Sequence, residues 1–249
     1  MWQELRAELH PRGLEIVTVA LDSGGADAAR KWIEAARAVD SPGGTPVDSP
    51  GGIPVDSPGG SPHPALIDRA HVCDELFGIV NVPSGVWIDE RGMIVRPPET
   101  AYPRRPAFLD REIPPDATPR QREALEANRR LRIDAERYVA ALRDWVANGD
   151  VSRYALAPDE VVGRSRPRPM EHSTAAAHFE LGLELQRRGD AERAAGHFRE
   201  AHRLQPENWT YKRQAWALAG NDRDRLYATD WLAEVKKIGA ENYYDPFDD

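Results

Sequence analysis

Cys73 is the residue best suited to nucleophilic or redox chemistry, because it is the single cysteine of the 249-residue chain. A thiol becomes an effective nucleophile when its pKa falls, as it does at a helix N-terminus or beside a cationic side chain. Cys73 lies within a short predicted helix, and the nearby His71 is two residues away, on another helical face. We interpret Cys73 as a buried structural cysteine, and a redox role is the alternative. A single cysteine also excludes an internal disulfide or Cys-x-x-Cys site within this chain.

The other chemistry-bearing residues give no clear site. The histidines show no metal-site spacing with cysteine or carboxylate partners; they are His10, His63, His71, His172, His178, His197 and His202. We expect His178, His197 and His202 to lie on helix surfaces. Ser84 has no base nearby in sequence, so a serine hydrolase is not indicated. The sequence therefore predicts no catalytic residue, metal site or cofactor within the chain.

Composition and charge narrow the functional classes. The net charge of −8 argues against a general nucleic-acid binder, because phosphate contacts need a basic surface. No apolar run approaches the roughly 18 residues of a membrane span. The first residues, "MWQELRAELHPRG", lack the apolar core of a signal peptide. The chain as given is therefore predicted to be cytoplasmic, without a membrane segment.

The first part of the chain, residues 1–150, predicts alternating strands and helices. "LEIVTVALD" (Leu14–Asp22) is typical of a strand covered on both faces. A helix, a short strand at His63–Asp68 and a second helix with Val72, Leu76 and Ile79 on one side should follow. A β-hairpin with its turn at Gly92 comes next. One long helix, capped at Thr118 and ended by Gly149, should complete this part; its apolar stripe is Leu131, Ala135, Tyr138, Leu142 and Trp145.

A tandem octapeptide interrupts this part at residues 39–62, with the units "VDSPGGTP", "VDSPGGIP" and "VDSPGGSP". It has too few apolar groups to offset the entropy of ordering it. We interpret it as a flexible surface insertion. The alternative, a proline-motif ligand, lacks the anchoring cation of such motifs.

The second part is predicted to be helical. Residues 151–173 are basic, rich in proline and without periodicity, which indicates a linker before a domain at 174–249. From Ala175 a 34-residue unit of two helices resembles the tetratricopeptide repeat, TPR. Its defining positions include Leu181, Gly182, Leu185, Ala194, Phe198, Ala201 and Leu204. Small residues at 182, 194 and 201 suit a close helix crossing, whereas His178 stands where an aromatic residue is usual.

The stretches "LEIVTVALD", "NVPSGVWID" and "DERGMIV" together resemble the thioredoxin fold, in its TlpA/ResA-like and peroxiredoxin-related branch. The resemblance covers about residues 1–149 and implies an α/β domain followed by the TPR-like helices. It also implies that the Val82–Pro83 bond is cis. In that arrangement the loop of Val82, Pro83 and Ser84 faces the redox site, and Val82 N–H and C=O can pair with a protein or peptide client.

The resemblance also shows what this chain lacks. Family chemistry resides in Cys-x-x-Cys, or in one cysteine or selenocysteine, at the start of the first helix, where the helix N-terminus lowers the thiol pKa. That helix begins here at Met1, so both the motif and the central strand before it would fall upstream. Losing a central strand leaves two edges unpaired, at about 1–3 kcal/mol per bare backbone group. We expect Met1 to be internal to a longer protein, through a late start codon or a UGA selenocysteine codon read as a stop.

Two functions remain open at this point. The first is a thiol–disulfide oxidoreductase or related redoxin that acts on protein or peptide clients and is inactive as this chain alone. The second is a non-catalytic interaction protein that binds a partner through its TPR-like region. Aromatic side chains there serve either the core or a peptide groove, and we favour the core; they are Trp209, Tyr211, Trp216, Tyr227 and Trp231.

Overall fold

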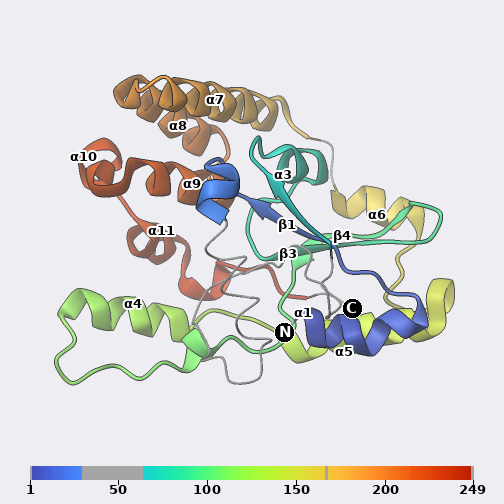
Figure 1. The fold of residues 1–249 in the computed structure, drawn as a ribbon. Coiled ribbons are helices and arrows are strands. Elements are labelled where there is room, and N and C mark those ends of the chain that lie inside the picture. Colours follow the sequence, from blue (N-terminus) through green and yellow to red (C-terminus); the bar gives the residue numbers. More distant parts are fainter. Residues whose placement is uncertain (1, 30–63, 166–167, 248–249) are drawn as a thin grey trace.

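Helices predominate in the mixed α/β fold of the computed structural model, which describes residues 2–29, 64–165 and 168–247 (Figure 1). The octapeptide insertion at 39–62 and most of the predicted helix before it lie outside the described residues. Figure 1 shows α7 and α8 stacked at one end of the molecule and α1 beside α5 at the other. The small sheets lie between these two helical layers.

The strands form two separate pairs. β1 (Thr18–Leu21) is parallel to β2 (Ala65–Asp68), and β3 (Ser84–Ile88) is antiparallel to β4 (Ile94–Thr100). The predicted hairpin is confirmed, and Gly92 at its turn has the positive φ of 79° that favours glycine. The predicted strand before Asp68 is confirmed as β2. No described strand joins one pair to the other, so each pair is a sheet of its own.

The prediction of a strand at Leu14–Asp22 buried on both faces is wrong in extent and burial. β1 has four residues, all half-buried, and the Val17 side chain before it is 52% exposed. β1 pairs with β2 along one edge, and within the described ranges no strand pairs with its other edge. A strand with one neighbour lacks the flanking strand that would bury it further.

The first part contains the helices α1 (Trp2–Leu9), α3 (Val72–Phe77), α4 (Pro119–Arg129), α5 (Ala135–Asn148) and α6 (Pro158–Ser165), and residues 25–29 are helical too. Short 3₁₀ turns lie at His10–Arg12, Ala107–Asp110 and Gly149–Val151. The Thr118 capping box is confirmed, since its side chain and that of Gln121 each accept from the other's backbone N–H. Gly149 ends α5, also as predicted.

The single long helix predicted after Thr118 is wrong, because the chain leaves the helix at 130–134 and forms α4 and α5 separately. The break sends the two segments into different cores. Leu131 packs with Leu109 and the aromatic residues of the C-terminal part, whereas Tyr138 and Leu142 pack with Trp87. A continuous helix would hold all three on one stripe and could not reach both cores.

The second part consists of α7 (Met170–Arg187), α8 (Ala191–Leu204), α9 (Trp209–Ala219), α10 (Arg223–Tyr227) and α11 (Trp231–Ile238). Its 3₁₀ turns lie at Gly220–Asp222 and Ala240–Asn242. The expected linker at 151–173 is wrong in its local structure, because it contains α6 and the start of α7. Pro158 suits the first helical position, where its missing N–H costs nothing, and it therefore starts a helix instead of preventing one.

The helical hairpin of α7 and α8 has the close crossing that its small residues predict. A Cβ on Gly182 would lie 2.6 Å from the Phe198 ring. Ala194 and Ala201 are buried, and Phe198 contacts Phe179 across the pair. Gly189, with a φ of 81°, and the N-cap Asp190 form the turn. Leu181 differs from the expectation, because it lies on the exposed side of α7.

The aromatic side chains of the second part pack inside, in agreement with the favoured core interpretation. Trp209, Tyr211 and Trp216 are buried, and Tyr227 and Trp231 are partly buried against the same clusters. These residues join α9 to α11, to the helical hairpin of α7 and α8 and to residues of the first part such as Leu109 and Leu131. The two parts therefore share a core.

His202 is half-buried, with its Nε2 atom enclosed and its ring against those of Trp216 and Tyr227, so its predicted position on an open helix surface is wrong. Burial lowers the pKa of its imidazole to about 4. In the unfolded chain the ordinary value of 6.5 applies, so between pH 6.5 and 4 the unfolded state binds more protons than the folded state.

We expect acid to remove about 3 kcal/mol of stability through His202 as the pH falls from 6.5 to 4, with no further loss through this group below pH 4. Urea unfolding of the parent chain and of His202→Phe at pH 7.5, 5.5 and 4.5 measures this contribution. The free energy of unfolding of the parent should fall relative to that of the variant on acidification. An unchanged difference across this range would contradict the prediction.

Candidate functional site

The loop before β3 is the candidate site that the sequence predicts, and its Val82–Pro83 bond is cis, as the resemblance implied. Val82 N–H donates to Asn81 Oδ1 at 2.9 Å, and Val82 C=O accepts from the Tyr244 hydroxyl at 3.3 Å. The two backbone groups expected to face a client are therefore both hydrogen-bonded within the chain.

Segments from the far end of the sequence hold this loop in place. The Asn81 side-chain N–H donates to Tyr243 C=O at 2.9 Å, and Trp209 N–H at the start of α9 donates to Val80 C=O at 2.6 Å. Tyr243 and Tyr244 are buried in the aromatic cluster of the second part. Sequence reasoning placed this cluster in another domain and missed its contact with the loop.

Ser84 has a structural part at the base of the hairpin. Its hydroxyl donates to Glu99 C=O at 3.1 Å, and its backbone pairs with Thr100. Ala101 N–H donates to Pro83 C=O at 3.2 Å and extends the pairing to the cis peptide. These bonds fix the loop against the end of β4. The Ser84 hydroxyl donates to a backbone carbonyl and not to a side chain that could act as its general base.

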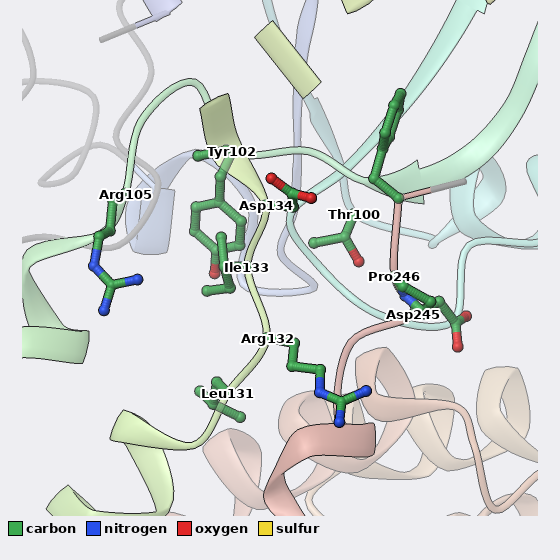
Figure 2. Close-up of a pocket in the computed structure, with 11 residues that line it drawn as sticks. Thr100, Tyr102, Arg105, Leu131, Arg132, Ile133, Asp134, Asp245 and Pro246 are labelled. Atoms are coloured by element: carbon green, nitrogen blue, oxygen red, sulfur yellow. The ribbon is translucent and has the colours of Figure 1, made fainter. Parts of the chain in front are cut away.

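A pocket of about 380 Å³ opens at the end of β4, where Thr100 in its lining pairs with Ser84 of the loop (Figure 2). Tyr102 in its wall shares a 2.8 Å hydroxyl contact with Tyr244, which in turn reaches Val82. Burial raises the pKa of Tyr102, so its hydroxyl stays neutral and serves as a hydrogen-bonding group. The other lining residues are Thr100, Arg105, Leu131, Arg132, Ile133, Asp134, Ala135, Asp245, Pro246 and Phe247.

The pocket carries both signs of charge, from two arginines and two aspartates in its wall. Arg105 is engaged with Asp110 through two bonds of 2.9 and 3.0 Å. Figure 2 shows Arg132 and Asp134 on the irregular segment between α4 and α5, with Asp245 across from them on the C-terminal segment. No thiol or histidine lies among the residues that line the pocket. It is therefore suited to holding a polar or zwitterionic group and has no nucleophile of its own.

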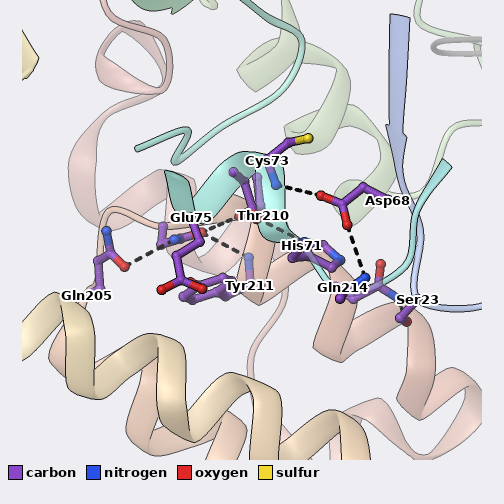
Figure 3. A network of polar contacts seen from close by, with 12 residues as sticks. Ser23, Asp68, His71, Cys73, Glu75, Gln205, Thr210, Tyr211 and Gln214 are labelled. Atoms are coloured by element: carbon purple, nitrogen blue, oxygen red, sulfur yellow. Dashed lines mark hydrogen bonds and ion pairs between the residues drawn. The ribbon is translucent and has the colours of Figure 1, made fainter. Parts of the chain in front are cut away.

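Cys73 lies away from this loop, on α3, where Asp68 holds its backbone (Figure 3). Cys73 N–H donates to Asp68 Oδ2 at 2.6 Å. Burial raises the pKa of the thiol, and the Asp68 carboxylate raises it further. A raised pKa disfavours the thiolate, which is the reactive form. Cys73 is half-buried, so the expectation of a buried residue is wrong in degree, whereas the raised pKa of its thiol agrees with a structural role.

We expect Cys73 to react with iodoacetamide more slowly at pH 7 than a free cysteine does, because less of it is thiolate. The rate should rise with pH along a curve displaced above the ordinary thiol pKa. Stopped alkylation followed by mass spectrometry gives the rate at each pH. A thiol that reacts faster than free cysteine at pH 7 would restore the redox alternative.

A buried polar network lies beside Cys73 and was not predicted (Figure 3). His71 Nδ1 is 3.0 Å from Asp74 Oδ2, and the Thr210 hydroxyl donates to the same oxygen at 2.9 Å. The expected apolar face of α3 is wrong, because Val72 is exposed and Leu76 is 77% exposed. The polar side of α3 turns inward, since α9 supplies the hydroxyl that satisfies Asp74.

This network joins α3 to α9 but does not form a catalytic triad. The Thr210 hydroxyl contacts Asp74 and, at 2.5 Å, Asn208 Oδ1, so neither bond activates it through the His71 imidazole. Both His71 and Asp74 are buried, and the His71 ring packs edge-on against Phe179. The network therefore fixes the start of α9 against the first part of the chain.

Comparison of the chain with protein-family models, with curated proteins and with solved structures gives no match. None of the helices in the described ranges combines the length and apolarity that crossing a membrane requires. The site must therefore be interpreted from its own geometry and from the sequence resemblance.

Proposed function

We propose that this chain is the client-facing part of a thioredoxin-like thiol–disulfide oxidoreductase whose redox cysteine or selenocysteine lies N-terminal to residue 1, after a central strand and directly before α1. The observation that carries the proposal is the split of the strands into two pairs. β1 and β3 each have one partner among the described residues, and each therefore keeps an edge available to a further strand.

The hydrogen bonds of β1 identify the available edge. Thr18 N–H donates to Pro64 C=O and Asp22 N–H to Asp68 C=O, so these residues point toward β2. Backbone groups alternate in direction along a strand, and Val19 and Leu21 therefore point to the opposite edge. A strand inserted between β1 and β3 would satisfy both edges and join the two sheets into one.

The order of elements supports the same assignment. Helix α1, strand β1, strand β2, helix α3, the Val82–Pro83 loop and the β3–β4 hairpin come in the order that the resemblance implies, and α4 and α5 follow where it implies one helix. In that order the central strand and its redox motif would immediately precede α1. The helical hairpin of α7 and α8 supports the TPR-like assignment through the close approach at Gly182.

The proposed chemistry is thiol–disulfide exchange. A thiolate at the start of α1 would attack one sulfur of a client disulfide, form a mixed disulfide with it and release the client's other sulfur as a thiolate. A second thiol would then attack the mixed disulfide, release the reduced client and leave the enzyme oxidised. Peroxide reduction by the same nucleophile is the related alternative.

The client would lie along Val82, Pro83 and Ser84, beside the pocket. The structure adds a condition to this placement, because the Val82 C=O already accepts from Tyr244. A client strand that pairs with Val82 must replace that hydroxyl. The mixed charges of the adjacent pocket suit the polar backbone and side chains of a peptide.

Insulin reduction by the purified chain in the presence of dithiothreitol tests the proposal. We expect no turnover above the no-enzyme control, because the redox group is outside the chain and Cys73 is a poor thiolate. Cys73→Ala is the matched control and should behave like the parent. Turnover that the parent shows and Cys73→Ala lacks would contradict the assignment of the redox group.

The interaction-protein alternative gains no specific support from the structure. Its candidate aromatic residues pack into the core instead of lining a groove. A partner captured through residues after Ala175, and retained when Val82 and Ser84 are changed, would favour this alternative over the redox proposal.

A further inference from the structure

Two histidines from different helices meet on the TPR-like hairpin. His178 on α7 and His197 on α8 are 19 positions apart, and their Nδ1 atoms are 2.8 Å apart. The ring centroids are 5.1 Å apart and the planes are tilted by 33°. Both side chains are half-buried, which leaves the pair accessible from solvent. In the metal-free molecule, this contact requires one ring to donate N–H to the other ring's lone pair.

From this geometry we propose that His178 and His197 form a site for a divalent transition metal of the Cu²⁺ or Ni²⁺ type, bound through both imidazoles. The proposal does not depend on the redox function. Neutral imidazole is a common protein ligand for these metals, whose affinity for nitrogen sites is high in the divalent series. The proposed metal replaces the proton that the two rings share.

The separation of the two nitrogens, which is set here by their hydrogen bond, lies closer to one metal geometry than to another. Two nitrogens bound at about 2.0–2.1 Å to one metal are about 2.9 Å apart when the angle at the metal is a right angle, and about 3.4 Å apart at a tetrahedral angle. The observed 2.8 Å is close to the first value. Cu²⁺ and Ni²⁺ prefer tetragonal geometry with right angles between neighbouring ligands, whereas zinc prefers a tetrahedral site.

The helices hold the two rings in position. The residue after each histidine is a fully buried phenylalanine, Phe179 on α7 and Phe198 on α8, and these two rings contact each other. Packing of the phenylalanines fixes how far each helix can rotate, and the tight contact at Gly182 fixes the separation of the helices. Ligands on packed helices are better preorganised than ligands on loops.

The surroundings define what kind of site this is. Glu200, one turn beyond His197, is close enough to His178 for their charges to interact and also pairs with Arg203 at 2.6 Å. No cluster of three or more histidine, cysteine or acidic ligands occurs within the described residues. The metal would therefore keep water in its remaining positions and exchange readily, unlike a closed structural zinc.

Calorimetric titration of the tag-free full chain with Ni²⁺ tests the proposal. We expect one equivalent of Ni²⁺ to bind. His178→Gln and His197→Gln should each weaken binding at least about tenfold, because even the removal of a group that only supports a metal ligand costs about that much affinity. His10→Gln is the matched control, because His10 is exposed and pairs with a carboxylate, Glu15, at 3.5 Å. Retention of parent affinity in either variant, or loss of it in the His10 control, would overturn the site.

A second readout separates ligation from folding. In a Cys73→Ala background, which removes the thiol that reduces Cu²⁺, the electron paramagnetic resonance spectrum of the Cu²⁺ form should show two coupled imidazole nitrogens, and either glutamine variant should show one. Ni²⁺ should raise the Tm of the parent by more than that of either variant. Two nitrogens in a variant spectrum, or an equal rise in Tm in all proteins, would contradict ligation by this pair.

Discussion

Replacement of Arg96 by alanine is expected to lower the free energy of unfolding by about 3–5 kcal/mol, the effect of breaking a buried ion pair from one side. The Arg96 side chain is 0% exposed and forms two bonds with Glu99, at 2.8 and 2.9 Å. It also donates to Tyr154 C=O at 3.2 Å, and its guanidinium lies 4.6 Å from the centre of the Phe247 ring. The variant leaves the largely buried Glu99 carboxylate without this cation.

Arg143→Ala is the matched control for Arg96→Ala. Arg143 also forms a two-bond pair, with Glu8 at 2.7 Å for both bonds, but its side chain is 50% exposed. Exposed pairs contribute about 0–1 kcal/mol, because water screens them and ordering the side chains costs entropy. Urea unfolding at pH 7 gives both values. Equal losses in the two variants would show that Arg96 is not buried as described.

Phe247→Ala is expected to cost about 3–5 kcal/mol, the usual range for removing a phenylalanine from a core. Phe247 is 5% exposed and packs in the same cluster as Trp87 and Tyr138, with its ring 5.7 Å from that of Tyr138. This residue of the C-terminal segment therefore completes the core of the β3–β4 hairpin. The near-ultraviolet circular dichroism of the buried tryptophans, Trp87 among them, should change with the same urea midpoint as the helical signal.

Leu76→Ala is the control for Phe247→Ala, because Leu76 is 77% exposed and its loss should change stability by no more than about 0.5 kcal/mol. A Phe247 variant as stable as the Leu76 variant would mean that the C-terminal segment is not part of the first core. Two separate unfolding transitions in the parent would lead to the same conclusion.

Local chemistry predicted several elements correctly. The capping box at Thr118 and Gln121, the glycine turn at Gly92 and the helical hairpin around Gly189 each depend on residues close together in the sequence. Their conformations follow from backbone preferences and from side chains that satisfy neighbouring backbone groups. The close approach of α7 and α8 at Gly182 was also predictable, because the spacing of small residues at 182, 194 and 201 indicates a close helix crossing.

The features that the sequence did not predict depend on contacts between segments that are far apart in the chain. The break between α4 and α5 depends on Leu131 reaching the C-terminal aromatic cluster. The inward polar face of α3 depends on Thr210, 136 positions further along the chain. The candidate loop was located from its proline, but its cover by Tyr243 and Tyr244 arises from tertiary packing that no local pattern encodes. The facing histidines, His178 and His197, follow from the pairing of two helices and not from a metal-site spacing.

In-frame reading of the encoding DNA upstream of Met1 tests the redox proposal most directly. We predict codons for a short β-branched strand, able to pair with β1 and β3, followed by a cysteine codon or a UGA triplet just before α1. An upstream frame with neither a strand-forming stretch nor such a codon would contradict the proposal that a redox group and its strand complete this sheet.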